Sequence, residues 1–150
     1  MSTKLKPGDI APDFELFDQN LNKFRLGDLI NDKPVVIFFY PKDETKICTK
    51  EACCFRDKYD EFIKHGVEVI GISCDSVESH QIFSDKHKLP YRILSDREGS
   101  VKDAYGVSKV LGIIKGRETF VVNKEGKIIK IYRDAFSGEE HVEQALEALN

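Results

Sequence analysis

The sequence predicts an α/β protein with a central mixed β-sheet flanked by helices. Two continuous apolar runs, residues 34–40 (PVVIFFY) and 67–74 (VEVIGISC), are rich in β-branched and aromatic residues and too short for typical helices. Such runs are typical of strands buried on both faces in the middle of a sheet. The residues between them have helical periodicity. The three segments therefore form a β-α-β unit, with parallel strands and a right-handed crossover.

Local signals place the next two helices. The first covers residues 48–66, where apolar side chains recur at helical spacing and Gly66 provides a C-terminal stop. A second helix is expected after Asp75, which forms a capping-box-like pair with Glu78, and it should end before Pro90. Each helix comes after a predicted buried strand in the chain, the first of them by way of a polar loop.

The C-terminal half completes the sheet. A short strand near residues 91–94 is followed by a turn and a brief helical segment. The segments ETFVV (118–122) and KIIKIY (127–132) flank the turn sequence NKEG, which predicts an antiparallel hairpin. Ser137 and Glu140 form an S-x-x-E capping box, so the chain is expected to close with a helix.

Length and composition limit the function classes. A chain of 150 residues without repeats or linkers is expected to form one domain over residues 1–150. The composition is 41% hydrophobic and 33% charged, and the net charge of -3 argues against a nucleic-acid partner. No apolar run approaches the ~20 residues that span a bilayer, and the N-terminus lacks the apolar core of a secretory signal. We therefore expect a cytoplasmic protein with no membrane partner.

The four cysteines are grouped unusually. Cys48, Cys53 and Cys54 lie close together, and Cys74 follows at a distance. This pattern does not resemble the spread disulfide framework of a small secreted domain. A zinc site is disfavoured because neighbouring ligands on a helix point about 100° apart and the C-x2-4-C spacing is absent. Cys74, at the end of a buried strand, is expected to be a core residue.

Cys48 is expected in the first turn of the first helix, where unpaired N–H groups and a partial positive charge favour a thiolate. A helix terminus contributes at most about 2 kcal/mol, so strong activation needs a neighbouring cation. On a regular helix the Cα atoms of Cys48 and Cys53 lie about 8.6 Å apart, and disulfides rarely bridge more than ~7 Å. Either these cysteines never pair or the first turns unwind. Alternatively, Cys53 and Cys54 are small hydrophobes packed in the helix.

Pro41, Thr45 and Cys48 stand as P-x-x-x-T-x-x-C, which resembles the active-site signature of the peroxiredoxins. FYPKD before this motif and CTKEAC-FRD after it are similar to the bacterioferritin comigratory protein, or peroxiredoxin Q, subfamily. GDIAPDFEL and GRETFVV extend the resemblance over nearly the whole chain. The resemblance implies a thioredoxin-like fold with an N-terminal β extension, and a thiol peroxidase activity.

The resemblance also implies a role for each residue of the motif. Cys48 would be the peroxidatic cysteine, which attacks hydrogen peroxide or an organic hydroperoxide and becomes a sulfenic acid. Thr45 would contact the thiolate and donate a hydrogen bond to the substrate, while Pro41 shields the site. Arg117 would contact the thiolate and the peroxide oxygens. Glu51 would orient this arginine, or would be a solvated carboxylate favoured by the helix dipole.

In subfamily members with a cysteine five residues after the peroxidatic one, that cysteine is the resolver, here Cys53. The helix geometry then makes local unfolding an obligatory step before an intramolecular disulfide forms, which thioredoxin or a similar thiol would reduce. Lys46 and Ile47 stand where the family commonly has Pro-Gly. Cys54 replaces a small polar or apolar residue and is an alternative resolver. A monomer, or a weak homodimer, is expected.

Two other functions share this chemistry. A thioredoxin-like disulfide reductase has a cysteine at a helix start but needs C-x-x-C there, which is absent. A peroxide-sensing or chaperone module would use Cys48 without fast turnover.

No cofactor or metal is expected, because no Gly-rich phosphate loop is present and the histidines have no ligand spacing. All four histidines are expected at the surface or at helix ends: His65, His80, His87 and His141.

Overall fold

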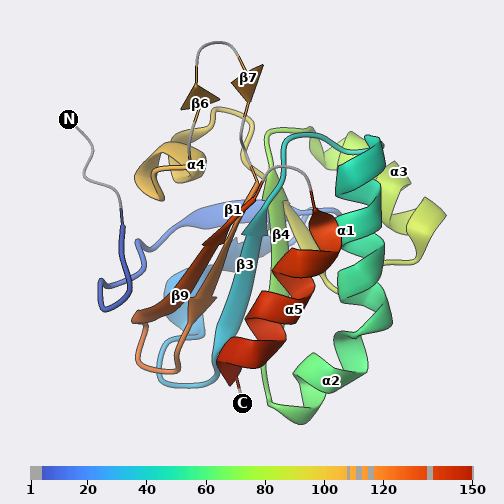
Figure 1. The fold of residues 1–150 in the computed structure, drawn as a ribbon. Helices are drawn as coiled ribbons and strands as arrows, with labels where there is room; N and C mark the ends of the chain where they lie inside the picture. Colours follow the sequence, from blue (N-terminus) through green and yellow to red (C-terminus); the bar gives the residue numbers. More distant parts are fainter. Residues whose placement is uncertain (1–4, 108, 111–112, 115–116, 135–136, 150) are drawn as a thin grey trace.

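The computed structural model describes residues 5–107, 109–110, 113–114, 117–134 and 137–149. The strands of the main sheet are β1 (Glu15–Asp18), β2 (Lys23–Arg25), β3 (Val35–Phe39), β4 (Glu68–Ser73), β5 (Arg92–Ser95), β8 (Glu118–Val122) and β9 (Ile128–Arg133). They form a seven-stranded sheet in the order β2-β1-β5-β4-β3-β8-β9 (Figure 1). A separate two-stranded hairpin consists of β6 (Lys109–Val110) and β7 (Ile113–Ile114).

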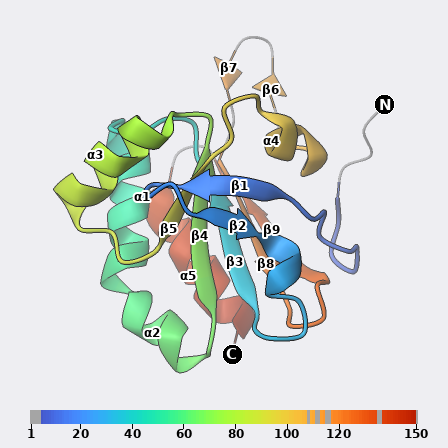
Figure 2. The same cartoon turned by 180° about the vertical axis from the view of Figure 1, so that it is seen from behind.

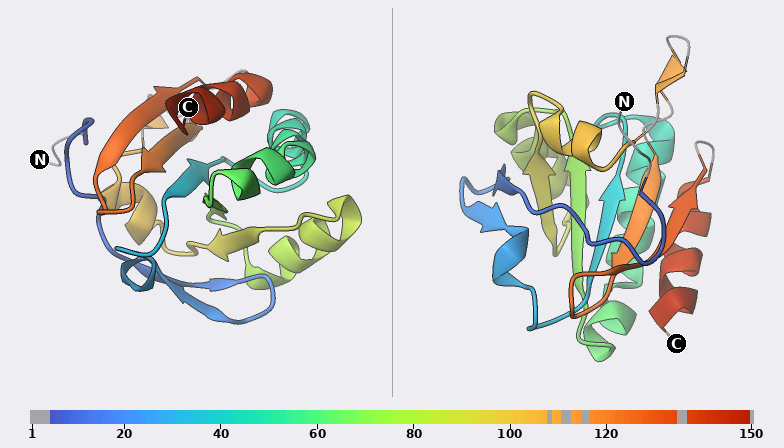
Figure 3. Two further views of the ribbon diagram at one scale, coloured as in Figure 1. Left: turned by 90° about the horizontal axis from the view of Figure 1, so that it is seen from below. Right: turned by 90° about the vertical axis from the view of Figure 1, so that its left-hand side faces the viewer.

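The helices are α1 (Lys46–Asp57), α2 (Tyr59–Lys64), α3 (Val77–His87), α4 (Ser100–Ala104) and α5 (Gly138–Leu149), with a 3-10 helix η1 (Leu26–Asp28). In Figure 1, α5 lies in front of the central strands and α1 stands beside α5, and Figure 2 shows the β1–β2 hairpin crossing the opposite side. The end-on view in Figure 3 separates these layers. In the part of the chain that the structure describes, no helix is long and apolar enough to cross a membrane.

The predicted β-α-β unit is confirmed. Strand β3 pairs in parallel with β4, and β4 pairs in parallel with β5. The predicted hairpin is also present, since β8 and β9 are antiparallel neighbours. The sheet is therefore mixed, as expected. The N-terminal β extension consists of β1 and β2, of which β1 joins the main sheet by antiparallel pairing with β5.

Strand β3 is buried along its whole length, and its alternate residues enter two different cores. Val36 and Phe38 face the core beneath α1 and α5, where Phe38 stacks on Phe55 of α1 with ring centroids 4.4 Å apart. Phe39 faces the opposite core and contacts Tyr105, with centroids 5.4 Å apart. This double burial explains why β3 reads as a continuous apolar run rather than an alternating one.

Two helix boundaries differ from the prediction. The single helix expected over residues 48–66 is divided at Lys58, whose backbone leaves helical geometry (φ -100°, ψ 6°) without a glycine or proline to signal it. The cap of α3 is Ser76 rather than Asp75. The Ser76 side chain accepts a hydrogen bond from the backbone N–H of Ser79 at 3.1 Å, whereas the carboxylate of Asp75 accepts from Ser73 Oγ at 2.7 Å.

Burial corrects three further expectations. Cys74 is exposed rather than in the core, because β4 ends one residue earlier, at Ser73. His80 and His141 are fully buried rather than at the surface. Each has hydrogen-bond partners for both ring nitrogens, which is how a buried polar side chain is tolerated. His65 is exposed, as expected.

Candidate active site

Cys48 lies in the first turn of α1, as predicted, and only 1% of its surface is exposed. The chain reaches it from the C-terminal end of β3 through a loop that spans residues 41–45. Thr45 is the cap residue of α1 and has extended backbone angles (φ -85°, ψ 155°). This strand–loop–helix arrangement aims the start of α1 at the sulfur, where unpaired N–H groups favour negative charge.

Arg117 provides the cation that the sequence argument required. Its Nη2 donates a hydrogen bond to Cys48 Sγ at 3.0 Å, and its Nη1 donates to Glu51 Oε1 at 2.5 Å. The sheet brings these residues together, because Arg117 directly precedes β8, whose first residue, Glu118, pairs with Phe39 at the end of β3. A buried guanidinium therefore places a positive charge and a hydrogen-bond donor directly on the sulfur.

Glu51 is fully buried, which excludes the solvated carboxylate considered from the sequence. Burial raises the pKa of Glu51 to about 8, although the charge and hydrogen bond of Arg117 oppose this rise. Burial alone would lower the pKa of Arg117, but the charges of Glu51 and Cys48 outweigh it and raise that pKa. Among the described residues, Glu51 Oε2 has no hydrogen-bond partner.

His141, on α5, lies behind this carboxylate, and sequence reasoning missed it. Its Nε2 is 2.7 Å from the carbonyl oxygen of Asp134, which can only accept, so Nε2 carries a proton. Nδ1 then accepts from Thr119 Oγ1 at 2.7 Å and lies 3.7 Å from Glu51 Oε2. Burial lowers the pKa of His141 to about 4, so the ring is neutral near pH 7. One signal in the sequence could have placed His141: it stands four residues before Ala145, and residues four apart lie on the same face of a helix.

Gly138, the first residue of α5, allows α5 to approach α1 at Glu51. A Cβ atom added at Gly138 would lie 2.6 Å from Glu51 Cβ and 2.8 Å from the backbone nitrogen of Glu51. Any other residue would force the two helices apart. The absence of a side chain at Gly138 therefore helps to position the carboxylate that holds Arg117.

Thr45 and Pro41 lie in the loop that precedes Cys48. The exposed hydroxyl of Thr45 donates to the carbonyl oxygen of Lys42 at 2.7 Å rather than to the sulfur. Pro41 is half-buried and lines a small hollow together with Cys74. The structure thus brings Arg117 to Cys48 and Glu51. The hydroxyl of Thr45 instead bonds within its own loop, and Pro41 lies beside the end of β4.

The candidate resolving cysteines share α1 with Cys48, since the helix is continuous to Asp57. None of the four cysteines is in a disulfide. Cys53 and Cys54 are both half-buried, and desolvation raises the pKa of each thiol. Cys54 lines a groove of about 170 Å³ between α1 and α5, together with Val142 and Leu146. This packing agrees with the role of a small hydrophobe for Cys54.

One cluster in the described residues has metal-ligand chemistry. Ligand-type atoms of Asp43, Asp75 and His80 lie within 4.8 Å of one another. His80 Nδ1 is 2.7 Å from Asp43 Oδ2, and Asp75 Oδ2 accepts from the backbone N–H of Asp43 at 2.8 Å. Each of the three ligand-type atoms thus has a hydrogen-bond partner within the protein, so we assign the cluster a structural role.

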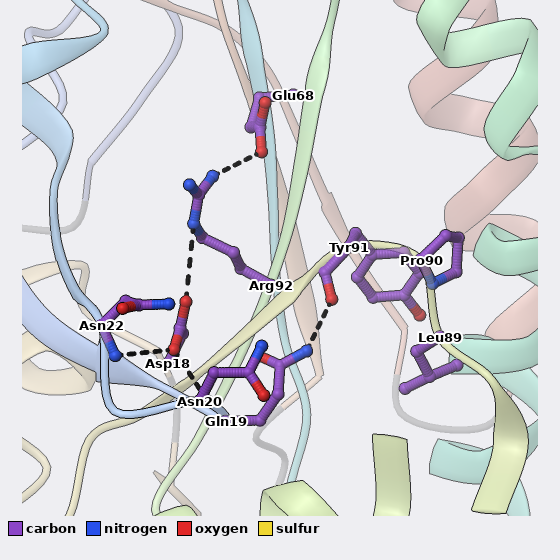
Figure 4. Close-up of a pocket in the computed structure, with 9 residues that line it drawn as sticks. All are labelled: Asp18, Gln19, Asn20, Asn22, Glu68, Leu89, Pro90, Tyr91 and Arg92. Carbon is purple, nitrogen blue, oxygen red and sulfur yellow. Dashed lines mark hydrogen bonds and ion pairs between the residues drawn. The ribbon is translucent and has the colours of Figure 1, made fainter. Parts of the chain in front are cut away.

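A polar hollow of about 370 Å³ lies at the other end of the parallel strands, where β4 and β5 begin (Figure 4). Arg92 bridges its two acidic groups, with distances of 3.7 Å to Asp18 and 2.9 Å to Glu68. Gln19 donates to the backbone oxygen of Tyr91 at 3.0 Å. The charged groups of this hollow are engaged with one another, at the opposite end of the parallel strands from Cys48.

Comparison with known proteins identifies the family. The AhpC/TSA family model matches residues 7–131. The chloroplastic peroxiredoxin Q of Sedum lineare is 45% identical over 97% of this chain and 78% of that protein. The peroxidoxin BcpB structure from Mycobacterium tuberculosis has a TM-score of 0.88 at 40% identity, covering 97% of this chain and 96% of that one. Xanthomonas campestris peroxiredoxin Q gives 0.83 at 32% identity, covering 91% and 89%.

These relatives correct one expectation. The cytoplasmic location expected from the sequence is contradicted, because similar relatives such as those of Sedum lineare, Gentiana triflora and Arabidopsis thaliana are named as chloroplastic. The expectation rested on the lack of a long apolar run. That test cannot detect organelle-targeting segments, which are amphipathic rather than continuously apolar.

The family also decides between the functions considered above, since a peroxidase is favoured over a sensor or chaperone module. The matched proteins are named as peroxiredoxins, and the name of one matched structure, of the Xanthomonas campestris bacterioferritin comigratory protein, mentions an alkyl peroxide reduction activity. On these grounds the chain belongs to the AhpC/TSA family, within its peroxiredoxin Q branch, and is a thiol-dependent peroxidase.

Proposed function

We propose that Cys48 is the peroxidatic cysteine of this enzyme and that Cys53 is its resolving cysteine. The observation that carries the first assignment is the 3.0 Å hydrogen bond from Arg117 Nη2 to a buried Cys48 Sγ. Glu51 holds the other guanidinium nitrogen, which fixes the orientation of the arginine. A pre-oriented cation of this kind stabilises charge in a reaction without having to reorganise.

In the first step, the Cys48 thiolate attacks the terminal oxygen of hydrogen peroxide or an organic hydroperoxide. The S–O bond forms as the O–O bond breaks, and the leaving oxygen takes a proton from water and departs as water or an alcohol. Arg117 stabilises the negative charge as it moves from sulfur to the leaving oxygen. To donate to the substrate, the Thr45 hydroxyl must rotate away from the Lys42 carbonyl. Pro41 shields the reacting sulfur from water.

In the second step, the Cys53 thiol attacks the sulfur of the Cys48 sulfenic acid. A disulfide forms and water leaves. Because both residues lie on the continuous helix α1, the first turns of α1 must unwind for the two sulfur atoms to meet. Thioredoxin, or a similar dithiol, then reduces the disulfide by thiol–disulfide exchange. Cys54, packed against α5, is the alternative resolver.

Steady-state peroxide consumption with thioredoxin and its reductase tests both assignments. Cys48→Ser should abolish turnover, and Cys53→Ser should abolish thioredoxin-dependent turnover. Cys54→Ser, the matched control on the same helix, should keep it. Loss of turnover in the Cys48→Ser protein alone would contradict the intramolecular mechanism.

The protein is also proposed to act as a monomer, because the disulfide mechanism needs no residue from a second copy. Analytical ultracentrifugation of the reduced and oxidised protein checks this. A stable dimer in both states would contradict it.

A further inference from the structure

The loop between β3 and α1 is held by α3 through one buried carboxylate. Asp43 is 4% exposed, and its Oδ2 accepts from Ser79 Oγ at 2.8 Å and lies 2.7 Å from His80 Nδ1. Its Oδ1 accepts from the hydroxyl of Tyr40 at 2.6 Å. Figure 1 shows α3 beside the start of α1. The segment that leads into Cys48 is therefore fixed to a neighbouring helix.

Both ring nitrogens of His80 face acceptors. Nδ1 faces the carboxylate of Asp43, and Nε2 lies 3.0 Å from the backbone carbonyl oxygen of Leu94. The buried ring of His80 thus links the carboxylate of Asp43 to β5 through its two nitrogens. Loss of His80 would remove one hydrogen-bond partner from a carboxylate that is cut off from water, so the contact resists separation.

The next residue of the loop is also held by α3. Glu44 has φ 65°, a left-handed conformation that is unfavourable for a residue with a side chain. Its carboxylate lies 3.0 Å from Lys86 Nζ and 3.1 Å from His87 Nε2. A strained backbone persists only where its surroundings fix it. The residue before the Thr45 cap thus depends on α3 as well.

These contacts oppose the movement that disulfide formation requires. Unwinding the first turns of α1 displaces the loop that ends at Thr45, and Asp43 anchors that loop two residues earlier. We propose that the buried Asp43–His80 pair sets the balance between closed α1, which reduces peroxide, and unwound α1, in which Cys48 and Cys53 can pair. His80 is a positioning residue in this account. The inference rests on the proposed function for the identity of the resolving step.

The test separates the two steps kinetically. Reduced protein is mixed with one equivalent of hydrogen peroxide, quenched at intervals, and analysed by mass spectrometry for sulfenic acid and for disulfide. His80→Leu should slow sulfenic acid formation and speed disulfide formation, each by about tenfold, a typical size for such a coupling. Less Cys48 should then reach the sulfinic acid at high peroxide, because the sulfenic acid has a shorter lifetime.

Three further variants make the result specific. His80→Asn keeps a donor toward Asp43 and should fall between wild type and His80→Leu. Ser79→Ala removes one donor to Asp43 from a half-buried position and leaves His80 in place. It should change both rate constants in the same directions as His80→Leu but by less, and it provides the test if His80→Leu does not fold. His65→Leu, at the exposed end of α2, is the matched control and should match wild type.

The proposal would be overturned if a folded His80→Leu or Ser79→Ala protein had the same two rate constants as wild type. It would also be overturned if sulfenic acid formation and disulfide formation slowed by the same factor. Failure of the proposed function looks different: wild type itself would form no Cys48–Cys53 bond. In that case the rate of sulfenic acid formation, which needs no resolving cysteine, still decides whether the Asp43–His80 pair positions Cys48.

Discussion

At the scale of single residues, the guanidinium of Arg117 connects Cys48, the proposed nucleophile, to Glu51. One nitrogen donates to Cys48 Sγ and another to Glu51 Oε1, and both partners are buried. The planar fork of arginine meets both acceptors at once, which an ammonium group cannot do in the same geometry. Glu51 therefore fixes the direction in which the guanidinium points, and the guanidinium holds its positive charge against Cys48 Sγ.

Arg117→Lys tests this point. The variant keeps the positive charge but loses the fork, so kcat/KM for hydrogen peroxide should fall by about 10²–10³, the usual effect of removing one oriented donor. Arg92→Lys is the control, because Arg92 also bridges two carboxylates, Asp18 and Glu68, but lies at the far end of the strands. If Arg117→Lys kept the wild-type kcat/KM, the positive charge at residue 117 would be enough for the reaction and the fork would not be needed.

At the scale of elements, the site depends on the contact between α1 and α5. Gly138 lets the start of α5 touch the backbone of Glu51, and His141 on the same helix lies behind the Glu51 carboxylate. The sequence predicted α5 from its Ser137–Glu140 box, and Glu140 N–H does donate to Ser137 Oγ at 3.3 Å. It did not predict that α5 would cover Glu51, because capping signals do not specify which surface a helix packs on.

Gly138→Ala should separate α1 from α5. The added methyl group overlaps Glu51, and overpacking of this kind costs about 1–3 kcal/mol. We expect a lower free energy of unfolding in urea and, in the folded variant, slower sulfenic acid formation. Gly66→Ala is the control. The positive φ of 68° at this residue would strain the backbone of an alanine, but an added Cβ atom would meet no neighbouring atom within 4 Å. It should lose stability and keep activity. Unchanged stability and activity in Gly138→Ala would refute the close approach.

At the scale of the whole molecule, the sheet topology assembles the site. Residues 48 and 117 are far apart in the chain but adjacent in space, because β3 and β8 are neighbours. Hydrophobic patterning predicted β3 and β4, since double burial leaves an unmistakable apolar run. It could not place Arg117, which only the GRETF resemblance indicated. His80 and His141 were missed because burial of a polar side chain depends on partners from distant strands and loops, such as Leu94 and Asp134.

The pH dependence of global stability follows from His141. Burial lowers its pKa to about 4, against 6.5 in the unfolded chain. Between these values the unfolded chain binds a proton that the folded protein does not, so the stabilisation is complete above pH 6.5 and is lost as the pH falls toward 4. At ~1.4 kcal/mol per pKa unit, the loss is about 3 kcal/mol.

His141→Gln removes this dependence. The difference in unfolding free energy between wild type and the variant, measured in urea at several pH values, should shrink by about 3 kcal/mol from pH 7 to pH 4. Glu51, whose raised pKa acts in the opposite direction between pH 4.5 and 8, is present in both proteins. If the free energies of unfolding of the two proteins changed in parallel with pH, a buried neutral His141 would be contradicted.

The central claim is that Cys48 is oxidised first and that Cys53 reaches it after α1 unwinds. Peptide mapping by mass spectrometry, after one equivalent of hydrogen peroxide in the absence of reductant, tests it most directly. We expect a Cys48–Cys53 disulfide as the dominant product. A dominant Cys48–Cys54 bond, or oxidation that leaves Cys48 as a reduced thiol, would contradict it.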